Sequence, residues 1–271
     1  MNRPPLIILF ILVYQFSFTQ SYLNVGARSN SMANASVALV DGWAYHNNPG
    51  ALGDLKKMEI GLSYENRFLL KDLQSQGLVY AFPIKVGVVS FGSQLFGSDA
   101  YKSYRVGGGY SMRLTDKLFI GVQLNYQGVR LSSNYGSKNT ITAEVGIFSK
   151  LTEKWNIGVS VFNLGRTKIS SFQDERLNTL LRIGSTYQLS SKVLFAMEAE
   201  KNINYQLRFK GAFEYSPVKK IFLRGGIKTQ PLAFTFGFGY KSKFVQLDFG
   251  SSYNQLLGWS PHISFTYKIG E

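Results

Sequence analysis

The chain has 271 residues, of which 45% are hydrophobic and 15% aromatic, while only 17% are charged. It contains no cysteine, which excludes disulfide bonds, thiolate metal ligands and a cysteine nucleophile. The formal net charge is +14, yet the basic residues are scattered singly between apolar ones. A nucleic-acid-binding protein usually gathers its basic residues into a patch, so the composition argues against a nucleic-acid partner.

Residues 1–20 have the layout of a secretory signal peptide. A single basic residue, Arg3, is followed by an apolar run over residues 6–14 and then by small and polar residues. The run is shorter than the ~20 apolar residues that a membrane-spanning helix needs. An uncleaved anchor is the alternative, but the short run and its interruption by Gln15 argue against it. We therefore predict that residues 1–20 are cleaved and that the protein is exported.

Residues 21–56 are rich in small residues and do not alternate between apolar and polar, so they are not expected to form part of a β wall. A short helix is predicted over residues 30–40. The segment ends in an Asn-Pro-Gly turn, which suits a sharp change of direction. We predict a small plug on the periplasmic side of a barrel mouth. Its structural core is predicted to be Asp41, Trp43, Asn48, Pro49 and Gly50.

From residue 57 onward, apolar and polar residues alternate with a period of two. In "LAFTFGFGY" (232–240), for example, the Phe side chains fall on one face of a strand, and Thr235 and two glycines fall on the other. About fourteen such segments are recognised, most of them near the ten residues that a tilted strand needs to cross a bilayer. Their predicted spans are 57–67, 75–82, 86–96, 103–113, 117–130, 139–150, 154–163, 178–189, 192–201, 205–215, 219–228, 232–241, 244–253 and 259–269.

The connections between these segments alternate in length. Tight polar turns such as 113–118 and 150–155 alternate with longer connections such as 130–139 and 164–178. Short periplasmic turns and longer outer loops are typical of outer-membrane barrels. Residues 57–271 are therefore predicted to be an all-β, transmembrane antiparallel barrel of about 14 strands in the outer membrane of a Gram-negative bacterium. A soluble β-sandwich is the main competitor, but nearly every strand carries aromatic residues, several of them near strand ends, and this favours the barrel.

Charged residues within the segments fall on the polar face, where they can pair or be hydrated inside the lumen. The hairpin around residues 198–210 places Glu198 and Arg208 on that face, and they are predicted to form a lumen charge pair. Further lysines and arginines fall in the turns and loops. At the two rims of a barrel they are expected to contact outer-membrane lipids and lipopolysaccharide.

The sequence does not predict an enzyme. Only His46 and His262 could act as a general base, and neither a GxSxG nor an HExxH motif is present. His46 lies in the plug turn and is expected to have a structural role. His262 has Ser260 and Ser264 beside it, so a Ser–His pair stays open at this position. We predict no catalytic residue, no metal site and no cofactor.

One stretch of the plug resembles a known signature. Gly26-Ala27-Arg28, Met32, Ala35, Val37-Ala38, Asp41-Gly42, Ala44-Tyr45, Asn48-Pro49-Gly50 and Leu52 are similar to the N-terminal pattern of the FadL-like outer-membrane barrels. The resemblance implies a fourteen-strand barrel, and it is closest to the PorV/PorQ proteins associated with type IX secretion. Asn34 and Gly50 depart from the family's usual Gly and Ala, and the chain is shorter than typical members.

The resemblance implies two different functions. A PorV/PorQ-like protein would be a non-enzymatic accessory of protein secretion or outer-membrane assembly, with a larger outer-membrane translocon or assembly complex as its partner. A FadL-type protein would transport hydrophobic small molecules and would bind a hydrophobic ligand. A transporter should have an apolar pocket and a lateral gap in the wall, whereas a docking barrel can be solid. The short outer loops and the lack of an apolar lumen cluster favour the accessory role.

Overall fold

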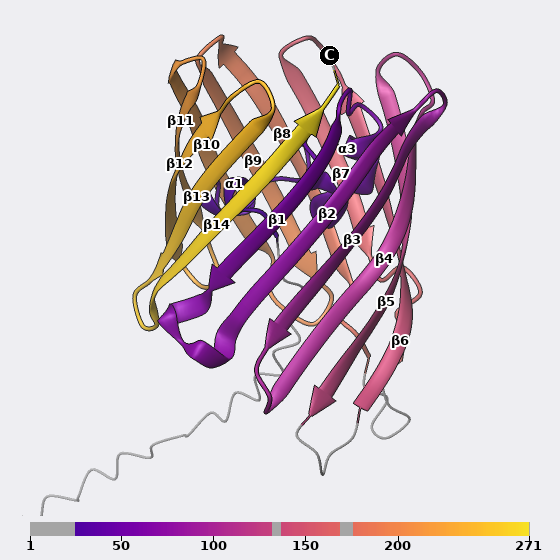
Figure 1. The fold of residues 1–271 in the computed structure, drawn as a ribbon, viewed down its shortest axis with the longest axis vertical. Helices are drawn as coiled ribbons and strands as arrows, with labels where there is room; N and C mark the ends of the chain where they lie inside the picture. Colours follow the sequence, from indigo (N-terminus) through magenta and orange to yellow (C-terminus); the bar gives the residue numbers. More distant parts are fainter. Residues whose placement is uncertain (1–24, 132–136, 169–175, 271) are drawn as a thin grey trace, which may run out of the picture.

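In the computed structural model, the described residues are 25–131, 137–168 and 176–270, and they form a closed antiparallel barrel (Figure 1). The predicted signal peptide lies outside these residues. The strands are β1 (Met58–Asn66), β2 (Gln74–Ile84), β3 (Gly87–Gly97), β4 (Tyr101–Arg113), β5 (Leu118–Leu131), β6 (Ser137–Lys150), β7 (Trp155–Phe162), β8 (Leu180–Ser190), β9 (Val193–Asn202), β10 (Arg208–Val218), β11 (Ile221–Lys228), β12 (Ala233–Lys241), β13 (Val245–Asn254) and β14 (Gly258–Ile269). Short helices are α1 (Ala27–Ser31), α2 (Ala44–Asn47), α3 (Pro49–Leu52), η1 (Arg67–Leu69) and η2 (Lys71–Leu73).

Each strand pairs with its neighbours in sequence, and β1 pairs with β14 to close the barrel. The closing ladder runs from Met58 opposite Ile269 to Glu65 opposite His262. Every segment predicted from the alternation overlaps one of these strands, so the prediction of a fourteen-strand all-β barrel is confirmed. Closure leaves no open sheet edge, which is what a lipid environment requires of a β-sheet.

Side chains alternate strictly between the lumen and the outside. In β12, buried residues such as Thr235 alternate with Phe234, Phe236 and Phe238, which are 45–48% exposed on the outer face. Large apolar side chains are exposed in this way around the barrel, as expected for a surface that faces lipid. Among the described residues, no helix is long and apolar enough to cross a membrane.

The two ends of the barrel differ. The turns β2–β3, β4–β5, β6–β7, β8–β9, β10–β11 and β12–β13 lie at the end where the chain's C-terminus lies, and we call this the turn end (Figure 1). The opposite end, which we call the loop end, carries the β1–β2 connection with η1 and η2 and the long β7–β8 connection. The alternation of short and long connections follows the sequence prediction.

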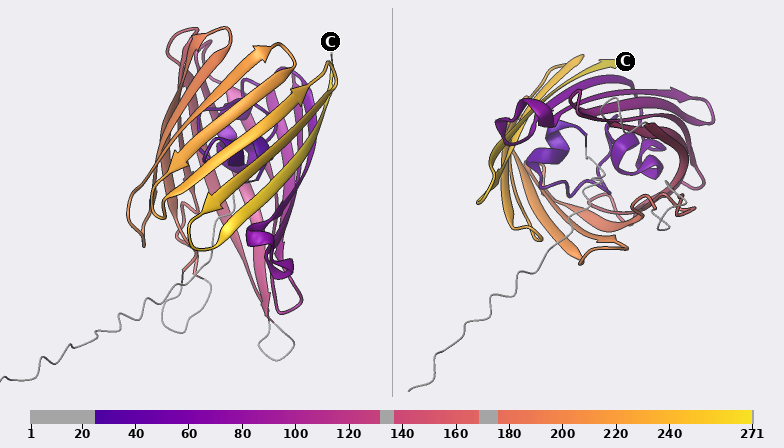
Figure 2. Two further views of the ribbon diagram at one scale, coloured as in Figure 1. Left: turned by 90° about the vertical axis from the view of Figure 1, so that its left-hand side faces the viewer. Right: turned by 90° about the horizontal axis from the view of Figure 1, so that it is seen from below.

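Residues 25–56, which we call the hatch, lie inside the barrel (Figure 2). The helix predicted over 30–40 is wrong. Helix α1 ends at Ser31 because Ala33 and Asn34 have positive φ angles of 54° and 59°, a left-handed conformation that cannot continue the helix. The Ala33 N–H instead donates to Thr235 Oγ1 of the wall.

Glycines of the wall make room for the hatch. A Cβ at Gly146 of β6 would overlap Asn48 Oδ1, and a Cβ at Gly121 of β5 would overlap the Pro49 carbonyl. The approach is mutual, because a Cβ at Gly50 would lie 2.5 Å from the Gly146 carbonyl oxygen. Helix α3 therefore packs backbone to backbone against β5 and β6. This close contact explains why a residue without a Cβ, Gly50, occupies the position.

We expect Gly146→Val to expel the hatch while leaving the barrel folded, because the new side chain would occupy the space of Asn48. Trypsin should then cleave at Arg28, which is largely buried in the wild type. The matched control is Gly211→Val on β10, where an added Cβ meets nothing within 4 Å. Heat-modifiable migration of both variants would report an intact barrel. Protection of Arg28 in Gly146→Val would contradict the prediction.

Candidate functional site

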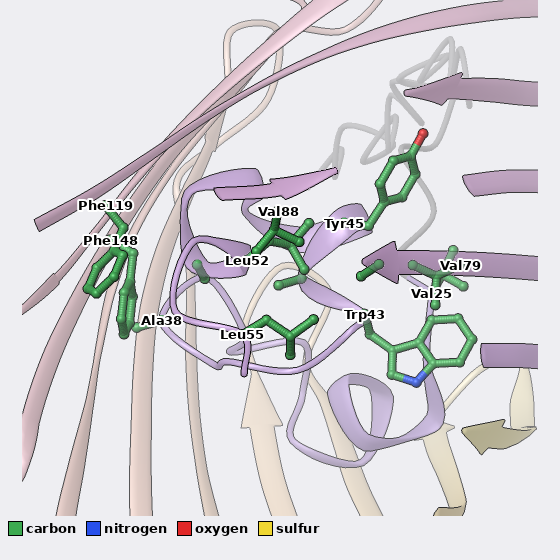
Figure 3. Packing of buried hydrophobic residues seen from close by; sticks show 13 residues of the cluster. Val25, Ala38, Trp43, Tyr45, Leu52, Leu55, Val79, Val88, Phe119 and Phe148 are labelled. Atoms are coloured by element: carbon green, nitrogen blue, oxygen red, sulfur yellow. The ribbon is translucent and has the colours of Figure 1, made fainter. Parts of the chain in front are cut away.

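The hatch is held against the barrel wall both by apolar packing, against residues such as Val79, Phe119 and Phe148, and by polar contacts. The polar contacts form the candidate site. The hatch contributes no strand to the barrel within the described residues. Its apolar side chains pack in two clusters: one contains Trp43, Tyr45 and Leu52 (Figure 3), and the other contains Met32 and Leu39. Around these clusters, the hatch donates and accepts hydrogen bonds to charged and hydroxyl side chains of many strands.

Arg28 makes the strongest of these contacts. Its Nη1 donates to Asp41 Oδ2 at 3.0 Å within the hatch. Its Nη2 and Nε donate to the two carboxylate oxygens of Glu214 on β10, at 2.9 and 3.0 Å. We call Arg28, Asp41 and Glu214 the Arg28 latch. A bidentate guanidinium–carboxylate contact fixes both distance and orientation, so the latch sets where α1 lies relative to β10.

The latch continues into the wall. Arg224 on β11 donates to Glu214 at 2.6 Å and to Asp248 on β13 at 2.7 Å. Burial alone would lower the pKa of the Arg28 guanidinium, but the charges of Glu214 and Asp41 outweigh burial and hold that pKa above its ordinary value. Arg28 is therefore a fixed cation inside the lumen.

A second contact replaces the predicted pair of Glu198 and Arg208, which is not formed. Glu198 lies opposite Lys210 and accepts a hydrogen bond from its Nζ at 2.7 Å, whereas Arg208 lies opposite Glu200 and bonds to it at 2.9 Å. The cross-strand register therefore differs by two residues from the one assumed. The other Glu198 oxygen accepts the backbone N–H groups of Ser36 and Val37, so this carboxylate binds the hatch.

The Asn-Pro-Gly turn is fixed to the wall through Asn48, which is fully buried. Its Nδ2 donates to the Val37 carbonyl at 2.7 Å and to the Ile147 carbonyl of β6 at 3.0 Å. Its Oδ1 accepts the Gly50 N–H at 3.0 Å and so caps α3, which begins at Pro49. Ser111 of β4 donates to the Pro49 carbonyl at 2.6 Å.

The remaining predicted plug residues lie in the same region. Trp43 is 1% exposed and donates its indole N–H to Thr266 on β14 at 3.1 Å. Asp41 belongs to the Arg28 latch. The structure thus brings Trp43 to β14 and Asn48, Pro49 and Gly50 to β4 and β6, whereas Asp41 binds Arg28 within the hatch. Their proposed role as the structural core of the hatch stays a prediction.

The two histidines both make structural hydrogen bonds. Burial, with Arg105 of β4 beside the ring, holds the pKa of His46 well below its ordinary value. The neutral ring then donates from Nε2 to the Leu78 carbonyl at 3.1 Å and accepts at Nδ1 from Arg105 at 2.9 Å.

His262 bonds to Ser63 of β1 at 2.9 Å. The two serines considered at the sequence level accept backbone N–H groups instead, Ser260 from Phe68 and Ser264 from Ala27.

Sequence reasoning missed the role of Arg28. It also missed that Glu214 and Glu198 bind the hatch rather than only pairing within the wall. The signal was present: a buried arginine in an otherwise small and apolar segment needs a carboxylate partner. The polar faces of β9 to β11 supply such partners, but which one faces Arg28 depends on the depth of the hatch in the lumen, which alternation does not encode.

Comparisons with known proteins give the fold. No family model and no curated protein matches the sequence. Similar solved structures include the CymD monoaromatic hydrocarbon channel (14% identity, 93% of this chain and 99% of that chain covered, TM-score 0.74). They also include the toluene transporter TbuX of Ralstonia pickettii (12% identity, 90% of this chain and 98% of that chain covered, TM-score 0.67). A third is a FadL homologue of Pseudomonas aeruginosa (12% identity, 92% of this chain and 99% of that chain covered, TM-score 0.65). The chain shares the FadL-like barrel fold with them.

We expect Asn48→Ala to loosen the hatch by about 1–3 kcal/mol, because it leaves two buried carbonyl groups without their donor and removes the α3 cap. Hydrogen exchange of residues 36–52, followed by mass spectrometry, should show faster exchange than in the wild type. The matched control is Asn204→Ala in an exposed loop of the barrel. Wild-type exchange and wild-type exclusion of small solutes in Asn48→Ala would contradict the prediction.

Acid should weaken the hatch through His46. Its pKa is lowered when the hatch is closed, so a released hatch binds a proton more readily, and stability present above about pH 6.5 is lost as the pH falls. The ratio of closed to released hatch should fall by up to about tenfold for each pH unit below this value. Acrylamide quenching of Trp43 in the Trp155→Phe/Trp259→Phe background would report it between about pH 7.5 and about pH 5.5. Adding His46→Gln should flatten the response, and an equal response in both proteins would refute it.

Proposed function

We propose that this protein is a channel of the outer membrane of a Gram-negative bacterium, and that it transports small hydrophobic or amphipathic molecules when the hatch shifts. The observation that carries the proposal is the Arg28 latch, together with the absence of strand pairing between hatch and wall in the described residues. Ion pairs and single hydrogen bonds can exchange for water or solute, whereas a paired strand could not leave without breaking the barrel.

The interior around the hatch supports such a movement. Several buried polar atoms have no hydrogen-bond partner among the described residues; they include Asn30 Oδ1, Asn47 Oδ1, Gln123 Oε1, Asn125 Nδ2 and Thr142 Oγ1. Buried polar atoms of this kind require water or another polar partner. Polar groups that water or a solute can satisfy therefore lie beside the hatch, next to the apolar cluster that it forms with the wall.

The comparisons support transport better than an accessory role in secretion. CymD, TbuX and TodX are described as a hydrocarbon channel and toluene transporters, and the likeness to PorV/PorQ proteins gains no support. The apolar outer face with aromatic residues toward the strand ends supports placement in a bilayer. Lipopolysaccharide and phospholipids would be the neighbours of the basic rims.

A reversible lock of the hatch tests the proposal. The Cβ of Ser31 lies 3.2 Å from the position that a Cβ at Gly250 of β13 would take, close to the Cβ separation of about 3.5–4.5 Å in disulfides. We expect liposomes containing Ser31→Cys/Gly250→Cys to release 4-phenylbutyrate faster than empty liposomes when reduced. Oxidation should bring release to the background, because α1 is then bound covalently to β13.

The single variants Ser31→Cys and Gly250→Cys are the controls, and both should be unaffected by oxidation because the natural chain has no other cysteine. Gly250→Cys is included because a Cβ there would lie 2.7 Å from the Ala27 carbonyl oxygen and could shift the hatch without any disulfide. Equal release in the oxidised and reduced double variant would refute movement of the hatch. Background release from the reduced protein and the wild type would refute a channel for this class of molecule.

A further inference from the structure

A cleft opens at the turn end of the barrel, along strands β8 to β11. It has a volume of about 580 Å³, within the range of small-molecule sites. It is lined by Gln188, Ser191, Lys192, Leu194, Glu214, Ser216, Pro217, Val218, Lys219 and Phe222. We call it the turn-end cleft.

The wall is irregular at this cleft. Within the described residues, the ladders of the barrel show two register shifts, one between Gln188 and Ser190 of β8 and one between Tyr215 and Val218 of β10. Both border the cleft, and the second contains Pro217, which lacks a backbone N–H to donate to the ladder. Bulges are common at barrel rims and beside functional sites, where they redirect side chains. Here they widen the mouth where the cleft lies.

The charge of the cleft is positive. Its one carboxylate, Glu214, has both oxygens occupied by Arg28 and Arg224. The ammonium groups of Lys192 and Lys219, one from each of two turns, have no hydrogen bond or ion pair to any described residue. A cavity with a neutralised acid and two unpaired cations attracts an anion.

The walls of the cleft are apolar. Leu194, Val218 and Phe222 line it, and the Phe222 ring is held in place by the Arg224 guanidinium, whose Cζ lies 5.5 Å from the ring centre. Leu194 also packs against the cluster that contains Met32 and Leu39 of the hatch. Two residues of the cleft lining therefore contact the hatch as well, Leu194 through this cluster and Glu214 through Arg28.

We propose that the turn-end cleft binds an amphipathic anion, with its anionic group between Lys192 and Lys219 and its apolar part against Leu194, Val218 and Phe222. This rests on the proposed channel function in one respect: the cleft would be the last site that a transported molecule occupies before it leaves the barrel at the turn end. A neutral hydrocarbon would make the apolar contacts but not the ionic ones.

Binding of 4-phenylbutyrate to the purified full-length protein in zwitterionic nanodiscs tests the site. Isothermal titration should show binding to the wild type and at least about tenfold weaker binding to Lys192→Gln/Lys219→Gln, since two charge-assisted contacts are lost. The neutral 4-phenylbutanol should bind the wild type and this variant equally weakly. The control variant is Lys220→Gln/Lys243→Gln, which removes two turn lysines that do not line the cleft, and it should bind like the wild type.

A second variant, Phe222→Ala, should also weaken binding. Protection of Arg28 from trypsin in this variant would show that the barrel and its hatch are still folded. Equal affinity of the wild type and Lys192→Gln/Lys219→Gln would overturn the proposal, as would wild-type binding too weak to detect up to about 10 mM. The liposome assay is independent of this result. Release through the wild type without lysine-dependent binding would refute anion binding in the turn-end cleft but support the channel function. Lysine-dependent binding without release would support the binding site but refute the channel function.

Discussion

The alternation of side chains in a closed barrel is the constraint on which the rest of this structure depends. A sheet that faces lipid must turn its apolar side chains outward, so the polar and charged ones all project into the lumen. There they must find partners, because a charge buried without one is costly. The wall therefore carries carboxylates such as Glu198 and Glu214 that its own bases satisfy in part, and the hatch supplies the remaining donors.

This arrangement makes the hatch specific in position without making it permanent. Replacing buried ion pairs by apolar residues is often neutral for stability, but removing one partner is strongly destabilising. The Arg28 latch is of this kind: Glu214 serves both Arg28 and Arg224, so loss of the hatch leaves the carboxylate with Arg224 still bound. Glu214 therefore has an ionic partner whether the hatch is bound or released. A fully apolar contact would offer no such substitute partner.

The same constraint decides which parts of the structure can be predicted from the sequence. The strands could be located because residues that face lipid are apolar and residues that face the lumen are polar or small, which gives each segment a period of two, as in β12. The predicted turn at Asn48 also holds, because the Asn-Pro-Gly pattern is a local capping signal. The helix at 30–40 failed because Ala33 and Asn34 take left-handed conformations that end α1. The Asn34 N–H bonds back to the Ser29 carbonyl, and the Ala33 N–H also donates to Thr235, which lies far away in sequence. The Glu198–Arg208 pair failed because register depends on the length of the β9–β10 connection, and a change of two residues keeps every side chain on its face.

The barrel fold is shared with the structural neighbours, whereas the side chains that line the lumen have to be considered for this chain alone. A fourteen-strand wall fixes the shape of the lumen, but the side chains that line it decide which molecule it can accept. In this chain arginines, lysines, glutamates and amides line much of the described lumen wall, and apolar surface gathers in the turn-end cleft and where the hatch packs against wall residues such as Phe119 and Phe148. A hydrocarbon gains nothing from the charges and would meet hydrated groups along the wall. A molecule with both an apolar part and an anionic group can exchange contacts with each in turn, which is why the lining favours an amphipathic solute over a purely apolar one.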